Sequence, residues 1–102
     1  MSQTTVVNLK RSQYDVYIGR RGRGLDGYFG NPFRIKRYGD GAHLHEIMEA
    51  YRRYFSNRIE ADAEFRRRVL ELSGKRLGCF CKPGPCHGDV IAEWLNAQES
   101  PQ

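Results

Sequence analysis

The sequence predicts a small α/β domain with a mostly parallel sheet of about three strands, three helices and a Rossmann-like character. Short segments rich in β-branched residues open the chain, amphipathic helical repeats fill its middle, and a further strand-like segment follows them. This strand–helix–strand order favours parallel pairing, because parallel strands need a long crossover. The 102 residues, of which 39% are hydrophobic, suffice for one core. We therefore expect a single domain over residues 1–102, with an ordered core at about 4–97.

Two strands and a long loop make up the first part of the chain. Residues 4–9 are rich in β-branched side chains, and residues 14–18 place Tyr14, Val16 and Ile18 on one face of an extended segment. Residues 19–41 then break the pattern with glycines, arginines and an Asn-Pro pair, which predicts a loop too long for a simple connection. Long ordered loops in small domains commonly carry a site.

Two helices, a strand and a last helix follow. Residues 43–58 repeat apolar side chains at helical spacing, and Asp62 and Glu64 suit the positive end of a second helix over 62–72. A third strand is predicted at 76–81. Its alternating pattern, with Gly78 and Phe80 opposite the other side chains, is expected of a strand covered on both faces. The last helix begins near residue 85 or 89 and ends near residue 96.

Residues 79–89 hold all three cysteines and one of the three histidines. One interpretation is a zinc site with four ligands of the right types, although the spacing of the ligands differs from that of common zinc modules. Its ligands would be Cys79, Cys81, Cys86 and His87. Free cysteine is also among the most buried residue types, and we interpret Cys79 in that way.

A reactive thiolate is the second interpretation of the same segment. Cys86 lies on the first turn of the predicted last helix, where the helix dipole and neighbouring cations favour the charged sulfur. His87 would be its acid/base partner, and Asp89 an orienting or capping carboxylate. A third interpretation is that the loop only binds, with backbone amides and His87 holding a phosphate.

Two loops are expected to line one crevice. In open α/β sheets ligands bind outside the carboxyl ends of parallel strands. The loops at 19–33 and 81–89 both leave from such ends, provided that the second and third strands are parallel. Guanidinium groups grip phosphate oxygens, and the amide of an asparagine reads both donor and acceptor edges. The predicted ligand-binding residues are Gly19, Arg20, Arg21, Arg23, Asn31 and Lys82.

Charge and cysteine content indicate which partners and which cellular compartment are expected. The net charge is +5, and its excess lies in residues 1–40, which carry eight Lys and Arg against three Asp and Glu. A locally basic surface attracts a phosphate-bearing small molecule or nucleic acid. An odd number of cysteines and the absence of a signal-like start predict a reduced, cytoplasmic protein. No apolar run approaches the roughly 20 residues of a membrane span, so no membrane partner is expected.

Several motifs in order resemble an uncharacterised family of small bacterial and bacteriophage proteins, domain-of-unknown-function family 4326. The motifs are Val16-Tyr17-Ile18-Gly19-Arg20, Gly30-Asn31-Pro32-Phe33, Ala50-Tyr51-Arg52-Arg53-Tyr54, Leu77-Gly78-Cys79-Phe80-Cys81-Lys82-Pro83 and Cys86-His87-Gly88-Asp89-Val90. The resemblance implies no reaction. The end of the chain is also similar to that of domain-of-unknown-function family 488, in which Cys-His-Arg opens the last helix. This chain has Gly88 in place of that arginine.

The residues together predict binding of a nucleotide or nucleobase phosphate in the crevice between residues 19–33 and 81–89. An enzyme of nucleotide or nucleic-acid processing is favoured, with Cys86 and His87 supplying the chemistry and no cofactor required. The alternative is a non-enzymatic zinc-binding module whose basic N-terminal part contacts nucleic acid. Phage occurrence, which the resemblance implies, would place the protein in the host cytoplasm. The oligomeric state is open.

Overall fold

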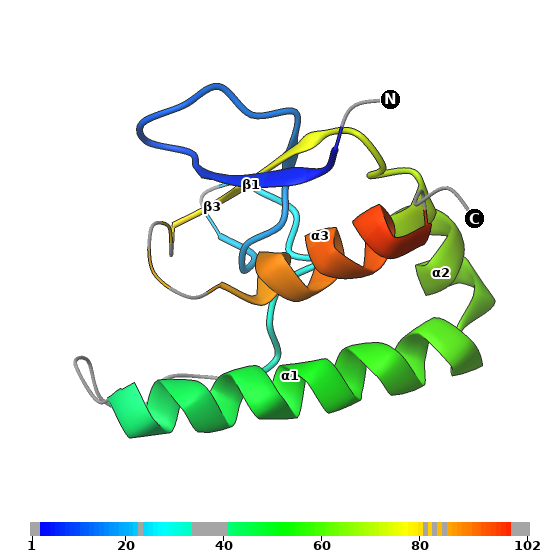
Figure 1. Ribbon diagram of the computed structural model, residues 1–102. Helices are drawn as coiled ribbons and strands as arrows, with labels where there is room; N and C mark the ends of the chain where they lie inside the picture. Colours follow the sequence, from blue (N-terminus) through cyan, green and yellow to red (C-terminus); the bar gives the residue numbers. More distant parts are fainter. Residues whose placement is uncertain are drawn as a thin grey trace.

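The computed structural model describes residues 3–22, 24–33, 41–80, 82, 84 and 86–98, with the backbone alone for residues 41–44. Three strands, β1 (Thr5–Asn8), β2 (Val16–Tyr17) and β3 (Arg76–Cys79), form a sheet in the order β1-β3-β2, and both pairs are parallel. Three helices, α1 (Gly41–Ala61), α2 (Ala63–Leu70) and α3 (His87–Gln98), lie on one side of this sheet (Figure 1). The predicted α/β class, with a parallel three-stranded sheet and three helices, is confirmed.

The core lies between the sheet and the helices. The long helix α1 contributes Ile47, Tyr51, Phe55 and Ile59, which recur every four residues and are at most 6% exposed. Leu77 of β3 is fully buried on the same side of the sheet. The first predicted helix is therefore confirmed, and it continues to Ala61.

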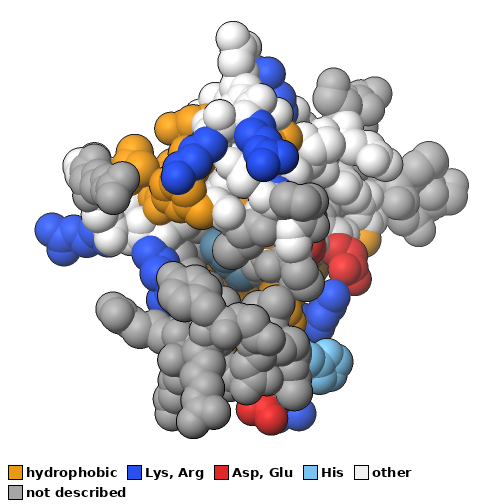
Figure 2. Space-filling model, turned by 90° about the vertical axis from the view of Figure 1, so that its left-hand side faces the viewer, with side chains coloured by type: hydrophobic (Ala, Val, Ile, Leu, Met, Phe, Trp, Pro, Cys, Tyr) orange, Lys and Arg blue, Asp and Glu red, His pale blue; other side chains and the backbone are white. Residues whose placement is uncertain are grey.

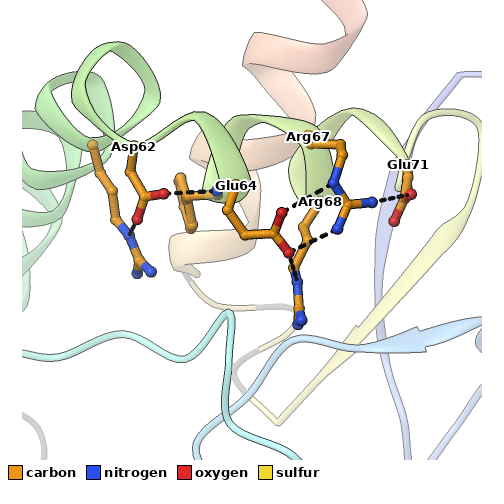
Figure 3. Close-up of polar contacts among 7 residues, drawn as sticks. Asp62, Glu64, Arg67, Arg68 and Glu71 are labelled. Atoms are coloured by element: carbon orange, nitrogen blue, oxygen red, sulfur yellow. Dashed lines mark hydrogen bonds and ion pairs between the residues drawn. The ribbon is translucent and has the colours of Figure 1, made fainter.

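Helix α2 has a capped start and a charged outer surface. The Asp62 carboxylate accepts a hydrogen bond from the backbone N–H of Phe65 at 3.0 Å, as the predicted N-terminus of this helix requires. Ion pairs join Glu64 to Arg67 and Arg68 at 2.7 and 3.0 Å, and all three side chains are exposed (Figure 3). The charges on this surface therefore compensate one another.

The third strand is covered on both faces, as predicted, but by different parts of the chain. Leu77, Gly78 and Cys79 of β3 are all buried, and the helices cover one face only (Figure 1). Leu77 and Cys79 face the helices and are 0% and 1% exposed, whereas Phe80 is 48% exposed. Since β1 and β2 flank β3, their connection at residues 9–15 has to cross β3, and the ring of Tyr14 lies over Gly78 on the helix-free face. A short crossover without a helix covers less of the sheet than a helix does.

Segment boundaries differ by a few residues from the prediction. Strand β3 ends at Cys79, and Cys81 lies outside the described residues. The last helix begins at His87, between the two predicted starts. The turn between α2 and β3 contains Gly74 with a φ of 77°, a left-handed conformation that explains the glycine there. In the described part of the chain, no helix combines the length and the apolar character of a membrane span.

Candidate functional site at the carboxyl edge of the sheet

The segments after β2 and β3 leave the sheet at the same edge. Because β2 and β3 are adjacent and parallel, as the predicted crevice required, both lead outward from their carboxyl ends. The ring Nε2 of His87, the first residue of α3, lies 2.7 Å from the backbone carbonyl oxygen of Ile18. This hydrogen bond joins the start of the Gly/Arg-rich loop to the start of α3.

The surroundings of His87 determine which ring nitrogen carries the proton. A carbonyl oxygen can only accept, so Nε2 donates to Ile18 and Nδ1 keeps its lone pair. The side chain is 5% exposed, and the ring of Tyr51 contacts it edge-on at a centroid distance of 5.3 Å. Burial lowers the pKa of His87 below its ordinary value of 6.5, although the Ile18 carbonyl acts in the opposite direction. At neutral pH the imidazole is therefore uncharged.

Cys86 occupies the N-cap position of α3, directly before His87. Its Sγ accepts from the backbone N–H of Gly88 at 3.4 Å and lies 3.8 Å from Nδ1 of His87. The backbone N–H of Cys86 donates to the Asp89 carboxylate at 3.2 Å, which is the contact that the third helical residue makes in a capping box. Cys86 is 1% exposed. The predicted thiol and its histidine are together, and both are closed off from solvent in this structure.

Asp89 takes the capping position foreseen for it, and it also binds Lys82. Its carboxylate accepts from the Cys86 backbone and lies 2.6 Å from the Lys82 ammonium group. The backbone carbonyl of Lys82 in turn accepts from the side-chain amide of Asn8 at 2.6 Å. These contacts tie the turn after β3 to both α3 and β1, and they give Lys82 a structural partner.

The two described cysteines touch each other. Cys79 is 1% exposed, as its interpretation as a buried strand residue requires, and its Sγ lies 2.9 Å from that of Cys86. Two thiolates on one tetrahedral zinc ion, each about 2.3 Å from it, would be about 3.8 Å apart. Among the described residues, no group of three or more His, Cys, Asp and Glu side chains is placed to hold a metal ion. Cys81, the other ligand in the zinc alternative, lies outside the described residues, and that alternative stays a prediction.

The predicted ligand-binding arginines lie on the loop surface. Arg20 and Arg21 are exposed, and the Arg20 guanidinium donates to the backbone carbonyl of Phe33 at 2.5 Å. Arg21 lines an open hollow of about 570 Å³, together with Gly22, Gly24, Leu25 and Asp26. Arg23 lies outside the described residues.

Gly19 and Asn31 shape the loop locally. Gly19 is buried against the ring of Tyr17, and a Cβ atom at this position would lie 2.4 Å from the Tyr17 hydroxyl oxygen. The side-chain oxygen of Asn31 accepts from the backbone N–H of Phe33 at 2.9 Å, which closes a turn. The structure thus uses this oxygen of Asn31 within the loop.

Sequence reasoning missed several groups at this edge. The carbonyl of Ile18 orients His87, and Tyr51 covers the imidazole, but neither contact leaves a signal in the sequence. Phe80 is different, because its position opposite Leu77 and Cys79 in the alternating strand pattern already placed it on the other face. The exposure of Phe80 could have been predicted from that alternation, together with the absence of a helical pattern between the first two predicted strands.

Figure 2 looks at this edge, which is the left-hand side of Figure 1, where the strands end. Lys and Arg side chains are spread around the face, and fewer acidic side chains lie between them (Figure 2). Among the described residues, neither Arg20 nor Arg21 has an Asp or Glu within ion-pair distance. The edge is therefore electrostatically suited to an anion.

Comparison with known proteins places the chain in a family without assigning a reaction. A family model described as a domain of unknown function (DUF4326) matches residues 3–97. An uncharacterised 12.4 kDa protein from the nrdA–td intergenic region of Enterobacteria phage T4 is 36% identical over 91 residues, which cover 89% of this chain and 76% of that protein. No solved structure matches. The chain therefore belongs to domain-of-unknown-function family 4326, as its motifs had indicated.

Proposed function

We propose that the protein binds a nucleotide or nucleobase phosphate at the carboxyl edge of its sheet, between residues 19–33 and 81–89. The observation that carries this proposal is the hydrogen bond of 2.7 Å between His87 and the Ile18 carbonyl. It joins the segments that follow two adjacent parallel strands, at the edge where open α/β sheets bind ligands.

The charge of the loop supports an anionic ligand. Arg20 and Arg21 are exposed and lack a carboxylate partner among the described residues, whereas Arg58 and Arg76 are paired with Asp62 and Asp15. A guanidinium group without a carboxylate partner can form two parallel hydrogen bonds with phosphate oxygens. The ligand would thus bind at the rim, above the buried Cys86 and His87.

The pair beneath the rim supports an enzyme of nucleotide or nucleic-acid processing. Nδ1 of the neutral His87 faces the Cys86 sulfur at 3.8 Å, in position to take the thiol proton. The resulting thiolate would attack an electrophilic atom of the substrate, and the imidazolium would return its proton to the leaving group. Because Cys86 is 1% exposed, this step requires the covering segments to open first.

Calorimetric titration with inorganic phosphate, adenosine and a panel of nucleoside monophosphates tests the binding. We expect a monophosphate to bind more tightly than phosphate or adenosine alone. The double variant Arg20→Gln/Arg21→Gln should weaken it at least about five-fold, because hydrogen bonds to charged groups are strong. Arg53→Gln, which removes an exposed arginine of α1, is the matched control. Equal affinities of the two variants would contradict the proposed site.

The chemical role is tested separately, with a nucleotide that binds. Cys86→Ser should abolish its turnover and leave its affinity unchanged, since the thiolate acts after binding. Turnover that survives this substitution would remove Cys86 from the mechanism and leave the binding proposal in place.

A further inference from the structure

The helix-free face of the sheet carries three aromatic rings, from Tyr14, Tyr17 and Phe80, which we call the aromatic face. Register places Tyr17 beside Gly78 of β3, and the alternation of the strand puts Phe80 on the same side. Tyr14 reaches this side from the crossover, where its ring lies over Gly78. Tyr14 and Phe80 are 37% and 48% exposed, so their rings are accessible.

The rings are held in place by local contacts. The Tyr17 hydroxyl donates to the backbone carbonyl of Arg20 at 2.6 Å, and its ring meets that of Phe80 edge-on at a centroid distance of 6.3 Å. Gly78 permits the ring of Tyr14 to lie on the strand, since a Cβ there would come within 2.7 Å of it. A ligand would therefore find prearranged rings and lose little side-chain entropy on binding.

Positive charge borders the aromatic face. The Lys10 ammonium group lies 5.6 Å from the centre of the Phe80 ring, and Arg11 follows in the same turn. Neither has a carboxylate partner among the described residues. Asp15 is paired with Arg76 at 3.1 Å, so the acidic group nearby in the sequence is compensated. In Figure 2, whose upper part is the helix-free side, hydrophobic side chains lie beside Lys and Arg side chains.

We propose that the aromatic face binds single-stranded nucleic acid, with bases stacked on Phe80 and Tyr14 and phosphates bound by Lys10 and Arg11. Exposed rings beside cations that have no carboxylate partner in the described part of the chain match a strand whose bases are accessible and whose backbone is anionic. In a duplex the faces of the bases are stacked on one another, so they are not accessible to the aromatic rings. The positive border disfavours a basic protein partner.

This inference goes beyond the nucleotide site, because it uses other residues on another face of the sheet. The two can fail independently. Substitution of Phe80 should leave the affinity for nucleoside monophosphates unchanged, and substitution of Arg21 should leave the stacking surface intact.

Fluorescence anisotropy with a labelled strand of about 12 nucleotides, a length within the range that small single-strand-binding domains cover, tests the proposal. DNA, RNA and the corresponding duplex are compared at low salt. Phe80→Ala should weaken single-strand binding at least about five-fold, in line with the usual strength of base stacking on aromatic side chains. Leu70→Ala is the matched control, because Leu70 of α2 is a similarly exposed hydrophobic residue, at 43% against 48% for Phe80.

Lysine substitutions test the phosphate contacts. Lys10→Gln should lower the slope of log affinity against log salt by about 0.7, the value for one phosphate contact on a single strand. Lys75→Gln, in the turn that leads into β3 at the opposite end of the strand, should leave that slope unchanged. Circular dichroism of each variant establishes that it folds.

Three results would overturn the proposal. They are an absence of single-strand binding by the wild type at low salt, equal affinities of Phe80→Ala and Leu70→Ala, and duplex binding as tight as that of the single strand. The last result would indicate a purely electrostatic contact with the phosphate backbone.

Discussion

The outer surface of α2 and the junction of β2, β3 and α3 both bring polar side chains together, but in different surroundings. On α2, Glu64 and Arg67 pair at 2.7 Å with about half of each side chain exposed (Figure 3). At the junction, His87 and Cys86 are 5% and 1% exposed, and their partners include two backbone groups: the Ile18 carbonyl, which follows β2, and the N–H of Gly88 in α3. Exposed ion pairs contribute little, because water solvates the separated charges nearly as well. A buried polar group that loses its partner costs more.

The comparison also separates two kinds of positive charge. Arg67 and Arg68 of α2 have acidic neighbours one helical turn away, so these two arginines are compensated at the surface of the helix. Arg20 and Arg21 have no such neighbours among the described residues, although they belong to the same small domain. The number of basic residues is thus a poorer guide to an anion site than the presence or absence of their partners.

The strongest way to break the junction is to fill the space at Gly88. A Cβ there would lie 2.4 Å from Cδ1 of Ile18 and 3.1 Å from Val6, so Gly88→Val should push the start of α3 off the sheet. We expect a loss of about 3 kcal/mol in the free energy of unfolding, measured with urea. Ala97→Val, at an exposed position of α3, should cost less than about 1 kcal/mol. Similar losses would contradict the close packing.

The cap of α3 should be the next most sensitive feature. Asp89→Ala removes the acceptor of the Cys86 backbone N–H and the partner of Lys82, and should cost about 1 kcal/mol of unfolding free energy. Glu93 also lies on α3, and its exposed side chain pairs with Arg52 of α1. Glu93→Ala should therefore change stability much less. If both variants unfold at the same urea concentration, the cap does not stabilise the helix.

Acid should weaken the junction through His87. Burial lowers the pKa of the folded protein's His87 below the unfolded value of about 6.5, so the unfolded chain binds the proton more readily. The contribution of His87 to stability should be complete above the unfolded pKa of about 6.5 and should fall as the pH drops towards the folded pKa. Urea unfolding at several pH values between about 5 and 8 measures the free energy of unfolding in a range above that in which carboxylates titrate.

His87→Gln should flatten this pH profile, while His45→Gln, at an exposed position of α1, should keep the wild-type slope. A slope that persists without His87 would mean that another group takes up the proton.

The smallest effect is expected on α2. Glu64→Gln breaks exposed pairs with Arg67 and Arg68, and its effect on thermal unfolding should be close to the error of measurement and vanish at high salt. The arginines hold the pKa of Glu64 down to about 2, so any stability that it adds is present above the unfolded pKa of about 4.3 and lost as the pH falls towards 2. An effect as large as that of Asp89→Ala would remove the contrast between the two regions.

Much of this organisation could be predicted from local patterns. The apolar repeat of α1, the acidic start of α2 and the alternation in β3 each report a periodicity that neighbouring residues impose on the chain. The grouping of Cys86, His87 and Asp89 was also foreseeable, because they are consecutive or one helical turn apart. The contact of His87 with Ile18 spans 69 positions, and no local pattern encodes it.

The sequence by itself determined the α/β class and favoured a parallel sheet, since hydrophobic periodicity and the strand–helix–strand order follow from short-range geometry. Only the tertiary structure decided that β2 and β3 are adjacent, that Cys86 and His87 are buried, that Asp89 pairs with Lys82, and that one face of the sheet keeps exposed aromatic rings. Burial and pairing depend on which distant segments pack together, and residues far apart in the sequence settle them jointly.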